Sequence, residues 1–248
     1  TTVRRKLLLE CAKLVAEAAC EFGKRYKKVA ESLLEHYSEK ASENGLEGFE
    51  KSDLQRIASV LERSPRYPAQ SFHEAIQSLW FAHIFNTWED GINANSIGRI
   101  DQMLYHYYKK DLEAGIITQE EAFELLGCLW TKLYRDYDVQ QAAISGVTPK
   151  GFDGTNDLTY LVLDVTEQLG FIRCLSVRLH KKSPKKLVRR VLEVNKLGLG
   201  VPFIFNDDVL IPALMWNGIE EKDARDYAAI GCVEITIPGK ANPHAVSN

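Results

Sequence analysis

The stretch AAIGCVEITIPGK, residues 228–240, places a thiol, Cys232, two residues before a carboxylate, Glu234. Side chains of an extended strand alternate between its faces, so residues i and i+2 project to the same side. We therefore predict that residues 228–234 form one strand and that Cys232 and Glu234 line one small-molecule cavity. Gly231 allows the backbone to bend just before the thiol.

A buried strand with an inert cysteine is the alternative interpretation, because unpaired cysteine is among the most frequently buried residues. An acidic residue inside an apolar run argues against it, since a buried carboxylate needs a partner or a chemical role. Glu234 is such a residue. Cys232 and Glu234 are thus the candidate catalytic pair.

The composition is that of an ordinary globular protein. The chain has 248 residues, of which 45% are hydrophobic and 26% charged, and a net charge of −3. This balance gives no basis for a nucleic-acid or membrane partner. The five cysteines lack CxxC spacing, which indicates a reducing cytoplasm and neither a disulfide framework nor a metal site. The apolar runs are too short for a membrane span or a signal peptide.

Periodicity predicts a helix-dominated chain with strands only in its last third. Apolar residues at steps of three and four, with capping signals, predict the helices. The predicted helices cover residues 1–38, 53–63, 72–88, 99–113, 118–134, 156–169 and a segment that starts at 183–184. The predicted strands cover 175–179, 201–205 and 228–234. Strand–helix–strand alternation indicates barrel-like βα units, so the fold class is α/β.

The residues that follow the strand 201–205 form a second candidate site. Ligands gather at the carboxyl ends of parallel strands, which makes Phe205 and Asn206 candidate substrate contacts and predicts that Cys232 and Glu234 lie nearby. Asn206 could instead cap the next helix, because asparagine is a preferred N-cap residue. Both interpretations stay open.

Several short motifs, taken in their order and spacing, resemble the glycyl radical enzymes, the superfamily of pyruvate formate-lyase and its eliminase and decarboxylase relatives. They are FHEAIQ (72–77) with WF (80–81), GRIDQ (98–102), GTNDLTY (154–160), LSVR (175–178), GVPF (200–203) with FND (205–207), and ARDYA (224–228) leading into GCVE (231–234). The chain resembles the middle and catalytic part of such an enzyme.

The resemblance implies a barrel of two parallel half-sheets surrounded by helices, with the cysteine on a loop inside. Residues 1–248 would be a fragment of one catalytic domain, without the N-terminal part of the barrel and the C-terminal segment that carries the radical. It implies no bound cofactor except that glycyl radical, installed by a radical S-adenosylmethionine activating enzyme. A homodimer is expected for the full-length protein, and no turnover for this chain alone.

The resemblance also implies roles for the candidate pair. Cys232 matches the cysteine that passes hydrogen between the glycyl radical and the substrate, and Glu234 matches the acid or base of the eliminases and decarboxylases. The implied activity is a lyase or dehydratase that cleaves a C–O, C–N or C–C bond of a small substrate, with an arylacetate-type decarboxylase as the alternative. Formate acetyltransferase activity is disfavoured, because a second cysteine is expected where Val233 stands. A thiolate enzyme and a non-catalytic scaffold are the remaining alternatives.

Two departures from the family pattern concern the substrate. Diol dehydratases of the family tend to have a His-Ser pair where Asn93 and Ala94 stand, and an aspartate where Val246 stands. A site built to hold a hydroxyl group uses such residues for discrimination. We therefore expect Asn93, Ala94 and Val246 at the substrate site, and a larger or aromatic acid or another hydroxylated compound in place of a plain diol.

Overall fold

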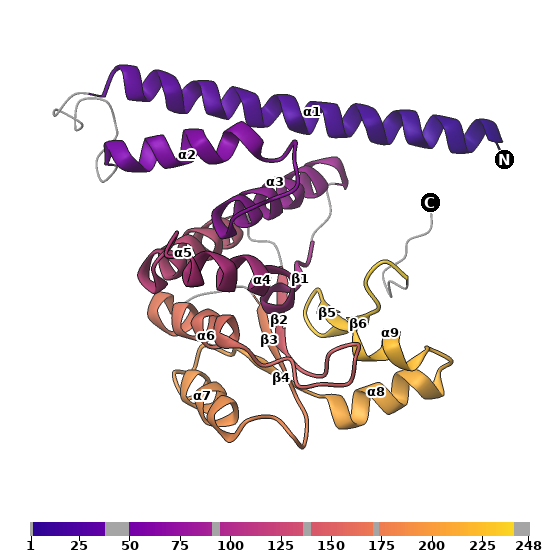
Figure 1. The fold of residues 1–248 in the computed structure, drawn as a ribbon. Coiled ribbons are helices and arrows are strands. Elements are labelled where there is room, and N and C mark those ends of the chain that lie inside the picture. Colours follow the sequence, from indigo (N-terminus) through magenta and orange to yellow (C-terminus); the bar gives the residue numbers. More distant parts are fainter. Residues whose placement is uncertain (1, 38–49, 91–94, 136–139, 171–173, 241–248) are drawn as a thin grey trace. The chain divides into compact units, whose positions relative to one another are not determined.

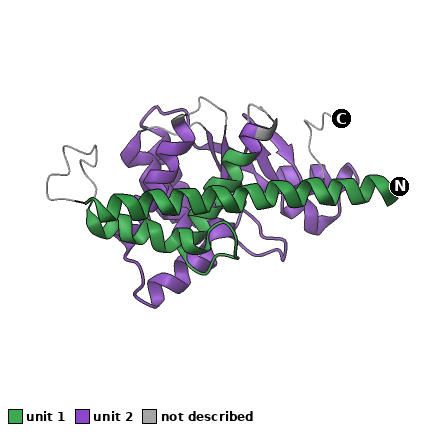
Figure 2. Ribbon diagram, turned by 90° about the horizontal axis from the view of Figure 1, so that it is seen from above, with its two compact units in different colours: residues 1–85 green, residues 86–248 purple. Residues whose placement is uncertain are grey.

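The computed structural model describes residues 2–37, 50–90, 95–135, 140–170 and 174–240 (Figure 1). The chain divides into two compact units, residues 1–85 and 86–248, which Figure 2 shows in different colours. Helix α3 crosses the boundary between them. None of the helices in the described part of the chain is long and apolar enough to cross a lipid bilayer.

Unit 1 is helical and is held together by aromatic side chains. It contains α1 (Thr2–Glu35), α2 (Lys51–Arg63) and most of α3 (Phe72–Asp90). The ring of Phe22 on α1 meets Phe81 and Phe85 on α3 with centroids 5.6 and 5.2 Å apart, both edge to face. Leu61 of α2 is buried in the same cluster. All three helices thus contribute apolar side chains to one cluster.

Unit 2 combines a parallel sheet with helices and a hairpin. Its helices are α4 (Ile100–Glu113), α5 (Gln119–Arg135), α6 (Asp157–Leu169), α7 (Lys185–Asn195), α8 (Asp207–Trp216) and α9 (Glu221–Arg225). Its strands are β1 (Gly98–Arg99), β2 (Gln141–Ser145), β3 (Cys174–Leu179), β4 (Phe203–Asn206), β5 (Ala228–Ile230) and β6 (Glu234–Thr236). Strands β1–β4 form a parallel sheet in sequence order, and β5 pairs antiparallel with β6.

The helices expected from the sequence are confirmed, with ends within three residues of the prediction. Local chemistry explains the accuracy. The Asn156 side chain accepts a hydrogen bond from the Thr159 N–H, which caps α6, and Gly170 ends that helix with a left-handed φ of 66°. Such caps satisfy backbone groups that a helix end leaves without partners.

The parallel sheet has one face covered by helices and another covered by the hairpin. Figure 1 shows α4–α7 on one side of the sheet and β5–β6 on the other. This follows from the right-handed crossovers between parallel neighbours, which bring successive helices to the same face. Strand β2 is buried at all five positions, because both of its faces are covered.

The predicted single strand over 228–234 is wrong. The chain runs as β5, turns through residues 231–233 and returns as β6. Gly231 begins the turn with a φ of 55°, a left-handed conformation that glycine adopts without a steric penalty. Cys232 therefore lies at the tip of a hairpin and not within an extended segment.

Candidate functional site

The tip of the hairpin is held at the amino-terminal end of the sheet. The Gly231 N–H donates to the Ser96 hydroxyl over 3.0 Å, and the Gln141 amide Nε2 donates to the Cys232 carbonyl over 2.6 Å. Ser96 precedes β1, and Gln141 is the first residue of β2. The turn that carries the thiol is thus fixed from two neighbouring strands.

The carboxyl group of Glu234 folds back onto this turn. Its Oε2 accepts hydrogen bonds from the N–H groups of Cys232, at 2.9 Å, and Val233, at 3.1 Å. Cys232 is exposed and Glu234 is half-buried. The turn and these two bonds, and not strand alternation, bring the Glu234 carboxyl group to the main chain of Cys232. That the two side chains line one cavity stays a prediction.

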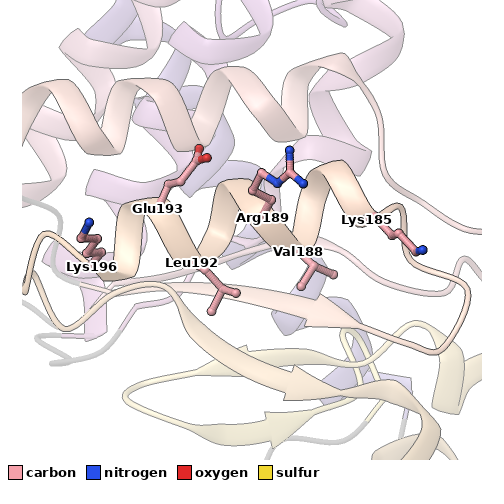
Figure 3. Close-up of a pocket in the computed structure, with 6 residues that line it drawn as sticks. All are labelled: Lys185, Val188, Arg189, Leu192, Glu193 and Lys196. Atoms are coloured by element: carbon pink, nitrogen blue, oxygen red, sulfur yellow. The ribbon is translucent and has the colours of Figure 1, made fainter.

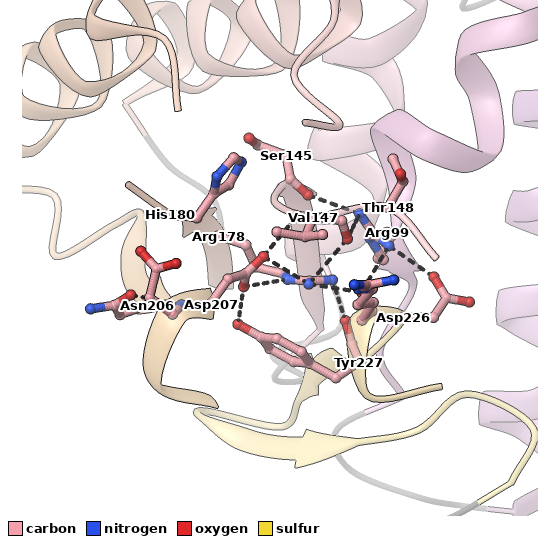
Figure 4. A network of polar contacts seen from close by, with 12 residues as sticks. Arg99, Ser145, Val147, Thr148, Arg178, His180, Asn206, Asp207, Asp226 and Tyr227 are labelled. Carbon is pink, nitrogen blue, oxygen red and sulfur yellow. Dashed lines mark hydrogen bonds and ion pairs between the residues drawn. The ribbon is translucent and has the colours of Figure 1, made fainter. Parts of the chain in front are cut away.

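A buried ion pair holds the other end of the hairpin (Figure 4). The Arg178 guanidinium, on β3, donates from Nε to Asp207 Oδ1 at 3.0 Å and from Nη2 to Asp207 Oδ2 at 2.9 Å. Its Nη1 donates to the carbonyl of Tyr227, the residue before β5, at 2.8 Å. Arg178 is 1% exposed, so both ions are desolvated and depend on these contacts.

Tyr227 completes this arrangement. Its hydroxyl donates to Asp207 Oδ1 at 2.6 Å, and Arg178 Cζ lies 3.8 Å from the centre of its ring. Burial raises the pKa of Tyr227 above its usual range, so the hydroxyl stays protonated and remains a donor. The fourth hydrogen bond to Asp207 comes from the Val147 N–H at 2.6 Å.

Arg99, a buried side chain at the end of β1, makes a second set of polar contacts with the same region. Its Nη1 donates to Asp226 at 2.8 Å, and its Nη2 donates to the carbonyls of Ser145 and Val147 at 3.1 and 3.3 Å. Both buried arginines of this face are therefore engaged with carboxylates and main-chain carbonyls, as Figure 4 shows.

The end of β2 is shaped by close approach to Arg178. A Cβ atom added at Gly146 would lie 2.6 Å from Arg178 Cβ, and Gly146 has a φ of 85°. Ser145 also has a positive φ of 62°. Its N–H donates to Asp101 Oδ2 at 2.7 Å and its carbonyl accepts from Arg99, so the surrounding contacts hold this uncommon conformation.

Asp101 is a fully buried carboxylate in α4. Its Oδ2 accepts from the Ser145 N–H and from the Thr159 hydroxyl at 2.5 Å, whereas its Oδ1 has no hydrogen-bond partner among the described residues. Burial raises the pKa of Asp101, and the bonds from Thr159 and Ser145 oppose that rise.

The strand end at residues 205–207 does not meet the thiol. Strand pairing sets Phe205 beside Arg178 and Arg178 beside Ser145, at the carboxyl end of β2. Cys232 is bonded to Gln141, four residues earlier, which is about 13 Å along a strand. The expectation that Cys232 and Glu234 lie near this strand end is therefore wrong.

The remaining predicted substrate contacts have other surroundings or lie outside the described residues. Phe205 packs against the cluster of Ile211 and Tyr227. The Asn206 side chain accepts from the Asp208 N–H at 3.0 Å and caps α8, as one of the two interpretations predicted. Asn93, Ala94 and Val246 lie outside the described residues.

Two further observations bear on ligand sites. Among the described residues, no group of three or more His, Cys, Asp or Glu side chains is placed to hold a metal ion. A shallow surface hollow is lined by residues of α7 and its C-cap residue, with Val188 and Leu192 on one side of the helix (Figure 3). The lining residues are Lys185, Val188, Arg189, Leu192, Glu193 and Lys196. One helix does not enclose a ligand, so this hollow is not the candidate site.

The sequence reasoning missed the residues that hold the hairpin. Ser96 and Gln141 carry no motif of their own, and β2 was not predicted. Arg178 left a signal, because a lone arginine in the apolar strand LSVRL needs a buried anion. The aspartate that follows the next strand, Asp207, is that anion.

Comparisons with known proteins identify the family. The family described as pyruvate formate lyase-like matches residues 1–247. The chain is 34% identical to an isethionate sulfite-lyase of Bilophila wadsworthia, over 96% of this chain and 30% of that protein. It is 33% identical to a trans-4-hydroxy-L-proline dehydratase of Clostridioides difficile, over 95% of this chain and 31% of that protein.

A solved structure shares the fold. The structure described for 1,2-propanediol dehydration in Roseburia inulinivorans matches with a TM-score of 0.82 and 36% identity, over 90% of this chain and 29% of that one. The expected α/β part-barrel is confirmed by this match. The chain spans about 30% of the length of the curated relatives that it matches. By sequence and by fold, the chain belongs to the pyruvate formate lyase-like family of glycyl radical enzymes.

Proposed function

We propose that this chain is the central part of a glycyl radical lyase that eliminates a group from a small organic substrate. Cleavage of a C–O bond, as in a dehydratase, or of a C–S bond is the reaction class that its relatives favour. The observation that carries the proposal is the exposed Cys232 at the hairpin tip, with the Glu234 carboxyl group bonded to the same turn.

The surroundings of Cys232 favour hydrogen-atom transfer over thiolate chemistry. The described hydrogen bonds to its turn involve Ser96, Gln141 and Glu234, which are two neutral groups and a carboxylate. A reactive thiolate is typically stabilised by a nearby cation or a helix amino terminus. A neutral S–H group needs neither in order to exchange a hydrogen atom.

The two side chains then have separate tasks. Cys232 would give its thiol hydrogen atom to a glycyl radical held elsewhere in the protein. Its sulfur would then take a hydrogen atom from the substrate carbon, and would return that atom to the product carbon radical after the neighbouring substituent has left. Glu234 moves a proton at the substituent on the neighbouring carbon, and its two bonds to the turn keep the carboxyl group in position beside the thiol. The exposed tip suits this exchange, because both the radical and the substrate must reach the sulfur.

The substrate and the partners follow from the family and from the departures in sequence. Asn93, Ala94 and Val246 replace residues typical of diol dehydratases, which favours a substrate other than a plain diol. Phe205 and Asn206 stay predicted substrate contacts of the complete barrel. We propose a radical S-adenosylmethionine enzyme as the activating partner and a homodimer as the assembled state.

The test uses the full-length protein, activated without oxygen, with isethionate, trans-4-hydroxy-L-proline and propane-1,2-diol as first substrates. Cys232→Ser should abolish product, and Glu234→Gln should slow turnover by about 10²–10⁴-fold, the usual contribution of a positioned acid or base. Both variants should keep the glycyl radical signal in electron paramagnetic resonance.

Cys128→Ser is the matched control, because Cys128 is also exposed and lies on α5. It should retain full turnover. Product formation by Cys232→Ser would refute the proposal. Release of carbon dioxide from an aryl acetate, without elimination from the other substrates, would support the decarboxylase alternative instead.

A further inference from the structure

The turn that carries Cys232 is held by two residues outside the GCVE motif. Ser96 Oγ accepts from the Gly231 N–H at 3.0 Å and from the Gln141 N–H at 3.2 Å. Gln141 in turn donates to the Cys232 carbonyl at 2.6 Å. We call Ser96 and Gln141 the tip latch.

Gln141 is anchored before it reaches the turn. Its N–H is bonded to Ser96, its carbonyl accepts from the Ile97 N–H at 2.9 Å, and its position in β2 is paired with Cys174 of β3. The side chain is fully buried. An amide on a fixed backbone loses little further freedom when it makes one more hydrogen bond.

The orientation of the Gln141 amide is set by chemistry. The Cys232 carbonyl only accepts, so the group that meets it must be the NH₂. The other end of the amide, Oε1, is buried and has no hydrogen-bond partner among the described residues. A buried acceptor without a partner lowers stability, and an apolar side chain of the same length would avoid that cost. A glutamine here is therefore poorly explained by stability alone.

We propose that Gln141, with Ser96, is a positioning residue for the Cys232 thiol. Ser96 holds the Ile230–Gly231 peptide through its N–H, and Gln141 holds the Cys232–Val233 peptide through its carbonyl. The turn is thus restrained before and after Cys232, which limits the directions that its side chain can take. The proposal rests on the proposed function in one respect, that Cys232 is the reacting thiol. The part of it that concerns the conformation of the turn does not depend on any reaction.

The first experiment measures amide hydrogen exchange of the full-length protein without radical or substrate. Gln141→Met keeps the length of the side chain and removes the donor. We expect the amides of residues 231–233 to exchange about three- to tenfold faster, the range for loss of one hydrogen bond. Exchange in β2 and β3 should stay unchanged.

Gln141→Glu separates positioning from packing. The carboxyl group has the same shape as the amide but donates only when protonated, as it is at low pH. Burial at position 141 raises the pKa of a carboxyl group there. After correction for intrinsic rates, the turn should therefore exchange faster than in the wild type at pH 8 and regain protection at pH 5. Gln141→Met should show no such recovery, because its side chain does not titrate.

Ser96→Ala gives a second, independent break of the latch. Removal of the hydroxyl group leaves the Gly231 N–H without its acceptor, so that amide should lose protection as well. Unchanged exchange at the turn in both Gln141→Met and Ser96→Ala would overturn the proposal. Faster exchange spread evenly over β1–β4 would also overturn it, because it would show a general role in the fold.

The activity arm uses the same variants after activation without oxygen. A loosened thiol should lower kcat at least tenfold with little change in KM and with the radical yield unchanged. If Gln141→Met loosens the turn and yet keeps the wild-type kcat, the positioning role is refuted. If Cys232→Ser stays active, the proposed function fails, and the exchange result still decides whether the latch holds the turn.

Discussion

The two faces of the β1–β4 sheet are stabilised by different interactions. On the helix side, Ile144, Leu175 and Val177 are fully buried and apolar. On the hairpin side, Ser145 and Arg178 are buried to the same degree and are polar or charged. Neighbouring residues of one strand thus experience opposite environments, as alternation along a strand requires.

The two kinds of interaction contribute differently to stability and to the placement of the hairpin. Apolar contacts are non-directional and tolerate changes of shape if volume is kept. Hydrogen bonds and ion pairs hold only at defined angles, and they fail when one partner is removed. The helix face therefore supplies most of the stability, and the hairpin face fixes where β5, β6 and Cys232 lie.

The largest effect is expected from Arg178→Met. The substitution keeps most of the volume and leaves the Asp207 carboxylate buried without its cation. Loss of one partner of a buried ion pair typically costs about 3–5 kcal/mol in the free energy of unfolding. It also frees the Tyr227 carbonyl at the base of the hairpin. Urea unfolding, with hydrogen exchange of residues 228–236, measures both losses.

Arg178→Lys is the companion variant. It keeps the charge, but a single ammonium group does not reproduce the fork that reaches Asp207 and Tyr227 together. We expect an intermediate loss of stability and a loosened hairpin. An Arg178→Met protein with wild-type stability and wild-type exchange would show that the polar face does not hold the hairpin.

A smaller effect, confined to the other face, is expected from Leu175→Ala. Truncation of a buried leucine typically costs about 2–5 kcal/mol in the free energy of unfolding, and it leaves no buried charge without a partner. The hairpin should keep its exchange protection relative to the sheet, because its bonds are made by Arg178 and Gln141. Selective loosening of residues 228–236 in this variant would contradict the separation of the two faces.

The sequence predicted most of the helix positions and proposed Cys232 and Glu234 as a candidate pair, which stays a prediction. It missed most of the contacts that hold the turn of Cys232. Helices were predictable because their periods and caps are local. Strand β2 escaped because QAAIS, buried on both faces, shows no alternation. The turn at 231–233 was not predicted, because the Glu234 side chain stabilises it, whereas the residues around it have the pattern of a strand. Gln141 and Ser96 are far from residues 231–232 in the sequence and contact them only in the folded protein. No local sequence pattern therefore predicts these contacts.

The smallest effect tests the border between the two faces, where Asp101 reaches from α4 to Ser145 at the end of β2. Burial raises the pKa of Asp101 in the folded protein above the ordinary value of 3.8. Between these two values the unfolded chain has released a proton that the folded chain still holds, so stability falls as pH rises through this window.

Asp101→Asn removes this titration and keeps an oxygen to accept from Ser145 and Thr159. The variant should equal or slightly trail the wild type at pH 4 and gain on it as pH rises to 8, by less than either effect above. Urea unfolding at several pH values measures the difference. Glu124→Gln, at an exposed position in the interior of α5, is the control and should stay close to the wild-type curve, because most surface substitutions change stability little. If Asp101→Asn also follows that curve, burial of the Asp101 carboxylate does not lower the free energy of unfolding. The polar contacts at this position would then carry no cost in stability.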